Sequence, residues 1–158
     1  MNDFILKYGS LKEPLLKNQS FKLGFDSLMS IQGGEILCDE KSLLDPNSRL
    51  SISIQDDFTC ITNSRIHNVG SLCKRYNFVK CNDSDLIYNL YKLKGNDFIN
   101  YIDGPFSIII IDHNSNTIHA FSDHFSSKPI FFYKGDDEIF FSSSINLLRK
   151  ITGNNKID

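Results

Sequence analysis

The stretch Phe106-Ser107-Ile108-Ile109-Ile110-Ile111-Asp112 decides the expected fold class of this chain. Four isoleucines follow one another without a polar residue between them, and β-branched residues favour strands. A strand with one face in water alternates apolar and polar residues, whereas a strand without alternation is covered on both faces. The stretch therefore predicts a buried strand whose sheet has further layers on both sides.

The neighbouring segments predict antiparallel sheet. Leu50, Ile52 and Ile54 alternate with polar residues, so one face of this strand is expected in the core and the other is polar. The turn at Asp56-Asp57 leads into a second strand, and strand, turn and strand recur twice near the end of the chain. The further predicted strands are 3–9, 58–62, 106–112, 117–122, 130–133 and 139–142, with two or three short strands within 20–38.

Four helices are expected between and after these strands. The clearest begins with Asp83 as N-cap, continues with apolar residues at helical spacing and stops at Gly95. The others are predicted over residues 69–76, 97–102 and 145–151. Together, the segments predict one domain over residues 1–152, with 153–158 as a polar tail or the start of a linker.

The composition excludes several classes of protein. Among 158 residues, 41% are hydrophobic and 12% aromatic, which is not the composition of a disordered chain. The formal net charge of -2, with no basic cluster, predicts neither a nucleic-acid nor a membrane partner. The four cysteines form no C-x-x-C pair and have no histidine at zinc spacing, so no metal is expected. Without a leader-like or membrane-length apolar run, we expect a cytoplasmic protein with reduced thiols.

Five segments in a fixed order resemble the glutamine amidotransferase domain of asparagine synthetases. They cover roughly residues 49 to 148, while the first 48 residues match poorly. Each segment alone is weakly specific, but their order and spacing together are specific. The segments are Arg49-Leu50-Ser51-Ile52, residues 62–68 (TNSRIHN), residues 83–95 (DSDLIYNLYKLKG), Gly104-Pro105-Phe106, and residues 122–133 (SDHFSSKPIFFY) followed by 140–144 (FFSSS).

The resemblance implies a fold and a chemistry. The family fold is an α+β, four-layer αββα sandwich of two antiparallel sheets, of the Ntn-hydrolase type, which agrees with the doubly covered isoleucine strand. In active members, the nucleophile is a cysteine at the mature N-terminus, and its own amino group acts as the base. Here the sequence opens with Met1-Asn2, at the expected end of the first strand. Because asparagine offers no nucleophilic atom, we expect no glutaminase activity and assign no catalytic residue.

The resemblance also implies a vestigial glutamine pocket. Arg49 matches the arginine that clamps the glutamine α-carboxylate, Asp83 matches the acid that receives the ammonium group, and Asn63 matches the oxyanion-hole asparagine. Ser64 and Arg65 stand where the family has glycine and glutamate, so one charge of the pocket is inverted. This inversion argues against glutamine as a ligand. From the charges alone, we hypothesise that Arg65 fills the pocket by pairing with Asp83.

Structural interpretations compete with these assignments. Arg49 also fits a solvated residue at a strand start, and Asp83 an N-cap, while a turn or capping function is favoured for Asn63. Ser10 after Gly9 is a weakly supported candidate for a nucleophile released by self-cleavage. The four histidines fit surface or hairpin positions. Three further positions depart from the family pattern: Ser122 lies where the family has arginine, Ser126 where it has glycine and Ser144 where it has glutamate.

The substitutions are similar to those in β-lactam synthetases and lasso-peptide cyclases, which activate a carboxylate with ATP and need no ammonia. This chain has no S-G-G-x-D-S stretch, so we expect ATP and Mg to belong to a separate synthetase domain or subunit, its partner. The first hypothesis is an inactive domain that packs against that synthetase. The alternatives are an active amidotransferase with a different mature N-terminus, and a non-enzymatic module that binds a peptide, a protein or a small amino-acid-like ligand.

Overall fold

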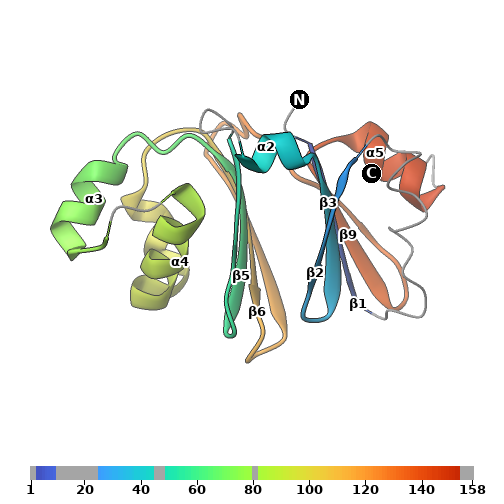
Figure 1. Cartoon of the computed structure of the whole chain (residues 1–158), viewed down its shortest axis with the longest axis horizontal. Coiled ribbons are helices and arrows are strands. Elements are labelled where there is room, and N and C mark those ends of the chain that lie inside the picture. The colour runs from blue at the N-terminus through green and yellow to red at the C-terminus, as the bar shows by residue number, and fades with distance from the viewer. Residues whose placement is uncertain (1–2, 10–24, 45–48, 80–81, 154–158) are drawn as a thin grey trace. The chain divides into compact units, whose positions relative to one another are not determined.

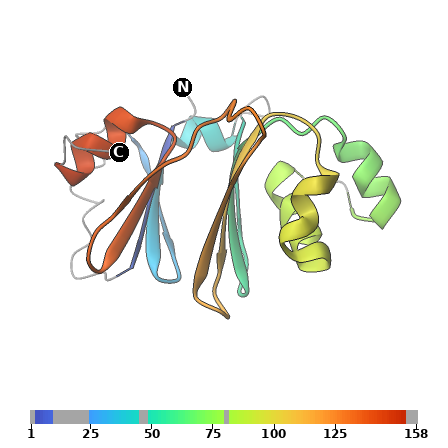
Figure 2. The same cartoon turned by 180° about the vertical axis from the view of Figure 1, so that it is seen from behind.

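The computed structural model describes residues 3–9, 25–44, 49–79 and 82–153, which Figure 1 draws in colour and Figure 2 shows from behind. The chain divides into two compact units. The first comprises residues 1–48 and 129–158, and the second comprises residues 49–128. Each unit contains one sheet whose strands are all antiparallel, together with helices. The predicted class, α+β with two antiparallel sheets, is therefore confirmed.

The first unit is built on a five-stranded sheet in the order β2-β3-β1-β9-β8. Its central strand pairs with β3 on one side and with β9, from the far end of the sequence, on the other. The core between the sheet and the last helix contains Ile5, Leu37, Phe140 and Leu148. The elements are β1 (Phe4–Gly9), β2 (Ser27–Ile31), β3 (Gly34–Cys38), α2 (Glu40–Leu44), β8 (Phe131–Lys134), β9 (Glu138–Ser142) and α5 (Ile145–Thr152).

The second unit is built on a four-stranded sheet in the order β4-β5-β6-β7. Helices cover one face of this sheet, as the green and yellow ribbons beside β5 and β6 show in Figure 1. The core under them includes Leu86, Leu90, Phe98, Ile108 and Ile110. The elements are β4 (Leu50–Ile54), β5 (Phe58–Ser64), α3 (Val69–Tyr76), α4 (Asp83–Lys94), the 3-10 helix η1 (Gly95–Tyr101), β6 (Phe106–Asp112) and β7 (Thr117–Ser122).

The isoleucine strand is buried as its sequence predicts. Ile108 and Ile110 belong to the core under the helices. Ile109 and Ile111 point to the opposite face because side chains alternate along a strand, and both are 0% exposed. Burial of one such side chain contributes about 1.5–3 kcal/mol, which explains why this strand carries no polar residue between positions 108 and 111.

Strand β4 departs from the predicted pattern. Ser53 is only 4% exposed, whereas Ile54 is 42% exposed. The serine face of β4 lies against α4, where the Ser51 and Ser84 hydroxyls are 2.7 Å apart in a hydrogen bond. The expectation that the apolar face alone is core was therefore wrong, because serine hydroxyls that have hydrogen-bond partners tolerate burial under a helix.

Two helix predictions also need correction. The N-cap of α4 is Asn82 rather than Asp83, since the Asn82 side chain accepts a hydrogen bond of 2.9 Å from the Asp85 N–H. The helix predicted over 97–102 is instead the 3-10 helix η1, which follows α4 directly. The remaining predicted strands and helices in the described residues are confirmed, with ends that move by at most a few positions.

Some expectations concern residues that the structure does not describe. Met1, Ser10, Cys81 and the segments 20–24 and 154–158 lie outside the described residues. The described cysteines, Cys38, Cys60 and Cys73, are free thiols. Within the described ranges, no helix has the length and apolar character needed to cross a bilayer.

Candidate functional site

The family motifs of the second unit meet at one end of its sheet. Strand β4 begins at this end, β5 ends there, β6 begins there and β7 ends there. The strand register places Leu50, Asn63, Ser107 and Ser122 side by side in one row across the four strands. Antiparallel pairing thus brings together segments that lie more than seventy positions apart in the sequence.

Asp83 is held by the chain itself at this sheet end. The Ser64 hydroxyl donates a hydrogen bond of 2.6 Å to Asp83 Oδ2, and the Ile66 N–H donates one of 3.2 Å to the same oxygen. Asp83 is the first residue of α4, where the helix N-terminus stabilises a carboxylate. We call Asp83, Ser64 and the Ile66 N–H the Asp83 corner. The acid expected to receive a substrate ammonium group therefore already has internal donors.

The hypothesis that Arg65 pairs with Asp83 was wrong. Arg65 is exposed, and no ion pair links it to Asp83 in the described part of the chain. Its backbone N–H donates to the Pro105 carbonyl at 2.9 Å, which continues the pairing of β5 with the segment before β6. The preceding residue, Ser64, supplies the hydroxyl that Asp83 accepts instead.

Asn63 is neither a turn residue nor a cap, contrary to the favoured interpretation. It lies inside β5, opposite Leu50 in β4 and Ser107 in β6. Because consecutive strand residues point to opposite faces, the Asn63 side chain lies on the other face from Ser64. Its Oδ1 atom is buried and has no hydrogen-bond partner among the described residues. The structure therefore does not join the expected oxyanion-hole residue to the Asp83 corner.

Arg49 lines a cavity of about 900 Å³, which we call the Arg49 pocket. All residues that line it belong to the second unit. They come from the start of β4, from the connection between η1 and β6, and from the loop after β7. None of the four other expected pocket residues, Asn63, Ser64, Arg65 and Asp83, lines it. The Ser64 N–H nevertheless donates a hydrogen bond of 2.8 Å to the Arg49 carbonyl, so Ser64 adjoins the cavity from the neighbouring strand without lining it.

Asp123 shapes the wall of this pocket. Its carboxylate accepts hydrogen bonds from the N–H groups of Phe106, Phe125 and Ser127, at 3.2, 3.0 and 3.1 Å, and from the Ser127 hydroxyl at 3.1 Å. Burial works to raise the pKa of Asp123, but these hydrogen bonds outweigh it and lower the pKa. An ionised Asp123 therefore fastens the loop after β7 to the start of β6.

Two backbone positions in this region have conformations that favour glycine. Gly104 has φ +123, and a Cβ atom there would overlap the Arg65 carbonyl oxygen, so the close approach of the two segments requires glycine. Ser126 has φ 49, in the left-handed region, at the position where the family pattern has glycine. Ser126 therefore has a backbone conformation that glycine adopts with less strain.

Lys128 is the residue of this site that sequence reasoning missed. Burial lowers the pKa of Lys128, and the positive charge of Arg49 lowers it further. Both side chains line the Arg49 pocket, and in the ranges that the structure describes neither has an ion pair or a side-chain hydrogen bond. Nothing in the sequence marks Lys128, because its proximity to Arg49 depends on how the loop after β7 folds.

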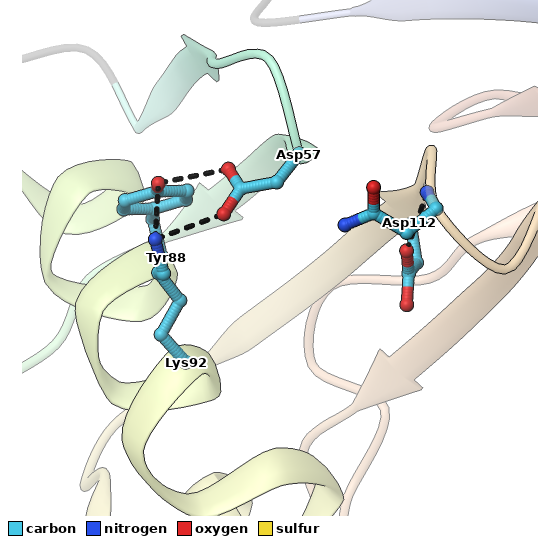
Figure 3. Close-up of polar contacts among 5 residues, drawn as sticks. Asp57, Tyr88, Lys92 and Asp112 are labelled. Atoms are coloured by element: carbon cyan, nitrogen blue, oxygen red, sulfur yellow. Dashed lines mark hydrogen bonds and ion pairs between the residues drawn. The ribbon is translucent and has the colours of Figure 1, made fainter.

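A polar network away from the pocket ties the β4–β5 turn to α4 (Figure 3). Lys92 Nζ lies 2.9 Å from Asp57 Oδ2, and the Tyr88 hydroxyl donates to Asp57 Oδ1 at 2.9 Å. The hydrogen bond from Lys92 is the main cause that lowers the pKa of Asp57. None of these residues lines the Arg49 pocket. Across the described residues, no group of three or more His, Cys, Asp and Glu side chains is arranged to hold a metal ion.

Comparison with known proteins identifies the class to which this fold and site belong. Residues 46–150 match the family described as glutamine amidotransferase domain. The chain therefore belongs to the class II glutamine amidotransferase domains, and within them to the asparagine-synthetase family. An asparagine synthetase [glutamine-hydrolyzing] of Bacillus subtilis is 34% identical over 91 residues, which are 56% of this chain and 12% of that protein.

Further relatives support the family and the fold. An asparagine synthetase [glutamine-hydrolyzing] of Zea mays is 27% identical over 68% of this chain and 19% of its own length. The chain thus spans less than a fifth of these relatives. The solved glutamine phosphoribosylpyrophosphate amidotransferase of Bacillus subtilis shares the fold, with a TM-score of 0.64 over 95% of this chain and 43% of that one. At a sequence identity of 11%, this similarity supports a shared fold and nothing further.

Proposed function

We propose that this chain is a catalytically inactive glutaminase-like domain of an ATP-dependent, amide-bond-forming enzyme. The proposed parent is similar to β-lactam synthetases or lasso-peptide cyclases. The observation that carries the proposal is the Asp83 corner: the acid that would receive the glutamine ammonium group is bonded by Ser64 and by the Ile66 N–H. The neighbouring family glutamate is replaced by Arg65, so a cationic ligand group meets a positive charge there.

Two buried thiols, Cys38 and Cys60, support the same proposal. Strand β1 contains no cysteine between Phe4 and Gly9, and the first cysteine of the sequence is Cys38 in β3. Burial raises the pKa of Cys38 to about 11, and the thiolate is the form that attacks an amide. Cys60 is fully buried, and burial raises its pKa as well. Neither thiol has the exposure or the pKa of a nucleophile.

The proposed role is structural and depends on a partner. A synthetase domain or subunit would bind ATP and Mg and form the amide bond, and this domain would pack against it and help to form its substrate entrance. Because such a parent needs no ammonia, loss of the ammonium site would carry no functional cost. The proposed setting is cytoplasmic, without nucleic acid or membrane.

A paired assay tests the proposed inactivity. Purified protein is titrated calorimetrically with glutamine, and glutamate release is measured in the same sample. We expect neither binding heat nor glutamate. The double variant Ser64→Gly, Arg65→Glu removes one of the two donors to Asp83 and restores a second carboxylate, so it should gain glutamine affinity by at least about tenfold, while still releasing no glutamate. Glutamate release by the unmodified protein would overturn the proposal.

One observation favours a second candidate function, an active amidotransferase with a different mature N-terminus. Arg49, the expected carboxylate clamp, remains in an open pocket without an internal partner in the described ranges. Mass spectrometry of the N-terminus of protein purified from its own cells decides this point, since the candidate requires a cysteine as first residue. A different N-terminal residue together with no glutamate release would exclude it.

A further inference from the structure

The Arg49 pocket contains two cations that have no anionic partner in the described ranges. Arg49 comes from the start of β4, and Lys128 comes from the end of the loop after β7. Lys128 is only partly exposed, and the charge of Arg49 acts on it strongly enough to lower its pKa, after the larger effect of burial. Two like charges held together in a partly buried place are unfavourable unless an anion joins them.

The acidic residues of the pocket form no ion pair with these cations in the described ranges. Asp123 uses both carboxylate oxygens for hydrogen bonds to Phe106, Phe125 and Ser127. Asp103 is exposed and forms no ion pair among the described residues. Among the described residues, the two cations therefore keep their donors for a ligand, while the charges of Asp103 and of the ionised Asp123 both oppose an anion in the pocket.

We propose that the Arg49 pocket binds a small ligand through a doubly charged oxyanion, either a phosphate monoester or a dicarboxylate. A guanidinium offers a planar pair of donors that matches such oxyanions, and an ammonium group adds a point charge. The exposed side chains of Ile99 and Phe125 line the same pocket and offer apolar contact to the rest of the ligand. A volume of about 900 Å³ accommodates a ligand of metabolite size.

This inference rests on the proposed function in one respect, namely that the site no longer processes glutamine. It goes beyond a retained carboxylate clamp because glutamine has one α-carboxylate and an ammonium group. A zwitterion of that kind satisfies Arg49 and leaves Lys128 unpaired, and the ammonium acceptor Asp83 does not line this pocket. A ligand that carries two negative charges and no positive group of its own satisfies both Arg49 and Lys128.

The test is calorimetric titration of the full chain in a low-salt buffer free of phosphate. The probes are inorganic phosphate, glutarate, acetate and glutamine. We expect phosphate or glutarate to bind at least about tenfold more tightly than acetate and glutamine. The tighter of the two dianions identifies whether the natural ligand is a phosphate ester or a dicarboxylate. Equal binding of acetate and both dianions, or no binding of any dianion, would overturn the proposal.

Variants connect the binding to the two cations. Arg49→Met and Lys128→Met should each weaken dianion binding at least about tenfold, whereas Lys74→Met, which removes an exposed charge on α3, should leave it within about twofold. Asp103→Asn should tighten binding. If Lys74→Met lost as much dianion affinity as Arg49→Met or Lys128→Met, general surface charge would explain the binding. If Asp103→Asn left dianion affinity unchanged or weakened it, the pocket would not be the binding site.

Stability measurements separate loss of the ligand site from loss of the fold. Because burial and the charge of Arg49 lower the pKa of Lys128, its ammonium form costs folding free energy, and Lys128→Met should not lower Tm. Weakened dianion binding at an unchanged or higher Tm supports the proposal, and weakened binding only together with a lower Tm counts against it. Glutamate release from glutamine, measured separately, would overturn the proposed function while leaving dianion binding as an independent result.

Discussion

The Asp83 corner and the Arg49 pocket lie at the same end of one sheet, but they differ in whether their charged groups have partners within the described residues. At the Asp83 corner, the carboxylate accepts from a neighbouring hydroxyl and a backbone N–H. In the Arg49 pocket, two cations have no partner among the described residues. A single substitution explains the first case, because a serine at 64 adds the hydroxyl that a glycine lacks. Arg49 and Lys128 cannot pair in this way, because two cations repel each other.

This difference separates two ways in which polar groups are accommodated at one end of a sheet. A carboxylate is readily satisfied from within the chain, since backbone and hydroxyl donors are abundant. A guanidinium and an ammonium group require carboxylate or carbonyl acceptors, and the Asp123 carboxylate in the wall of the pocket already accepts backbone hydrogen bonds. We infer that the corner contributes to stability and the pocket to binding, and the following predictions test that separation.

The largest effect is expected for Asp123→Ala. The variant leaves the N–H groups of Phe106, Phe125 and Ser127 without their acceptor and should lower the free energy of unfolding by about 2–3 kcal/mol. Urea unfolding measures this change, and dianion binding should be lost with the pocket wall. Asp103→Ala is the matched control, because this exposed carboxylate should change stability by less than about 0.5 kcal/mol. Equal losses in the two variants would contradict the assignment.

The next effect is expected for Asp83→Ala. Ser64 and the Ile66 N–H lose a charged acceptor, so the free energy of unfolding should fall by about 1–2 kcal/mol. Dianion affinity should stay within about twofold, because Asp83 does not line the Arg49 pocket. Asp97→Ala, an exposed acid in η1, serves as control. A large change in dianion affinity would show that corner and pocket are coupled.

A smaller effect is expected from acid. The pKa values of Asp57, Asp112 and Asp123 are lowered below their ordinary 3.8. Carboxylates with lowered folded-state pKa values contribute stability that is complete above the unfolded-state pKa and is lost as the pH falls through the folded-state pKa. Urea midpoints should therefore decrease from about pH 5 to about pH 2. Asp57→Asn should flatten this dependence, and an unaltered slope would mean that the ion pair with Lys92 contributes nothing.

The smallest effect is expected for Ser126→Gly. The left-handed backbone at 126 is unfavourable for serine, but glycine gains freedom in the unfolded chain, so the two contributions oppose each other. The free energy of unfolding should rise by no more than about 1 kcal/mol. Calorimetric Tm measures this, with Ser127→Gly as control, since that variant should destabilise by removing the hydroxyl that bonds Asp123. A fall in Tm for Ser126→Gly would mean that its side chain supports the loop.

The local sequence determined the strands, most helices and the family. The isoleucine run predicted a doubly buried strand because side chains alternate on a strand irrespective of what covers it, and Ile108 to Ile111 are all buried. Residues at turns and helix ends are similarly local, so Gly95 marks the end of α4 as predicted. The order and spacing of five motifs, each weak alone, were enough to identify the glutamine amidotransferase family, which the match over residues 46–150 confirms.

The tertiary structure decided which of the matched residues meet. The family pattern grouped Arg49, Asn63, Arg65 and Asp83 into one pocket, but of these only Arg49 lines the cavity, and Asn63 points to the opposite face of β5 from Ser64. Charge alone suggested that Arg65 pairs with Asp83, whereas the Ser64 hydroxyl occupies that carboxylate. Lys128 joins Arg49 only because hydrogen bonds to Asp123 set the shape of its loop. Sequence specifies backbone conformation over a few residues at a time, while contacts between distant side chains depend on the packing of the whole unit.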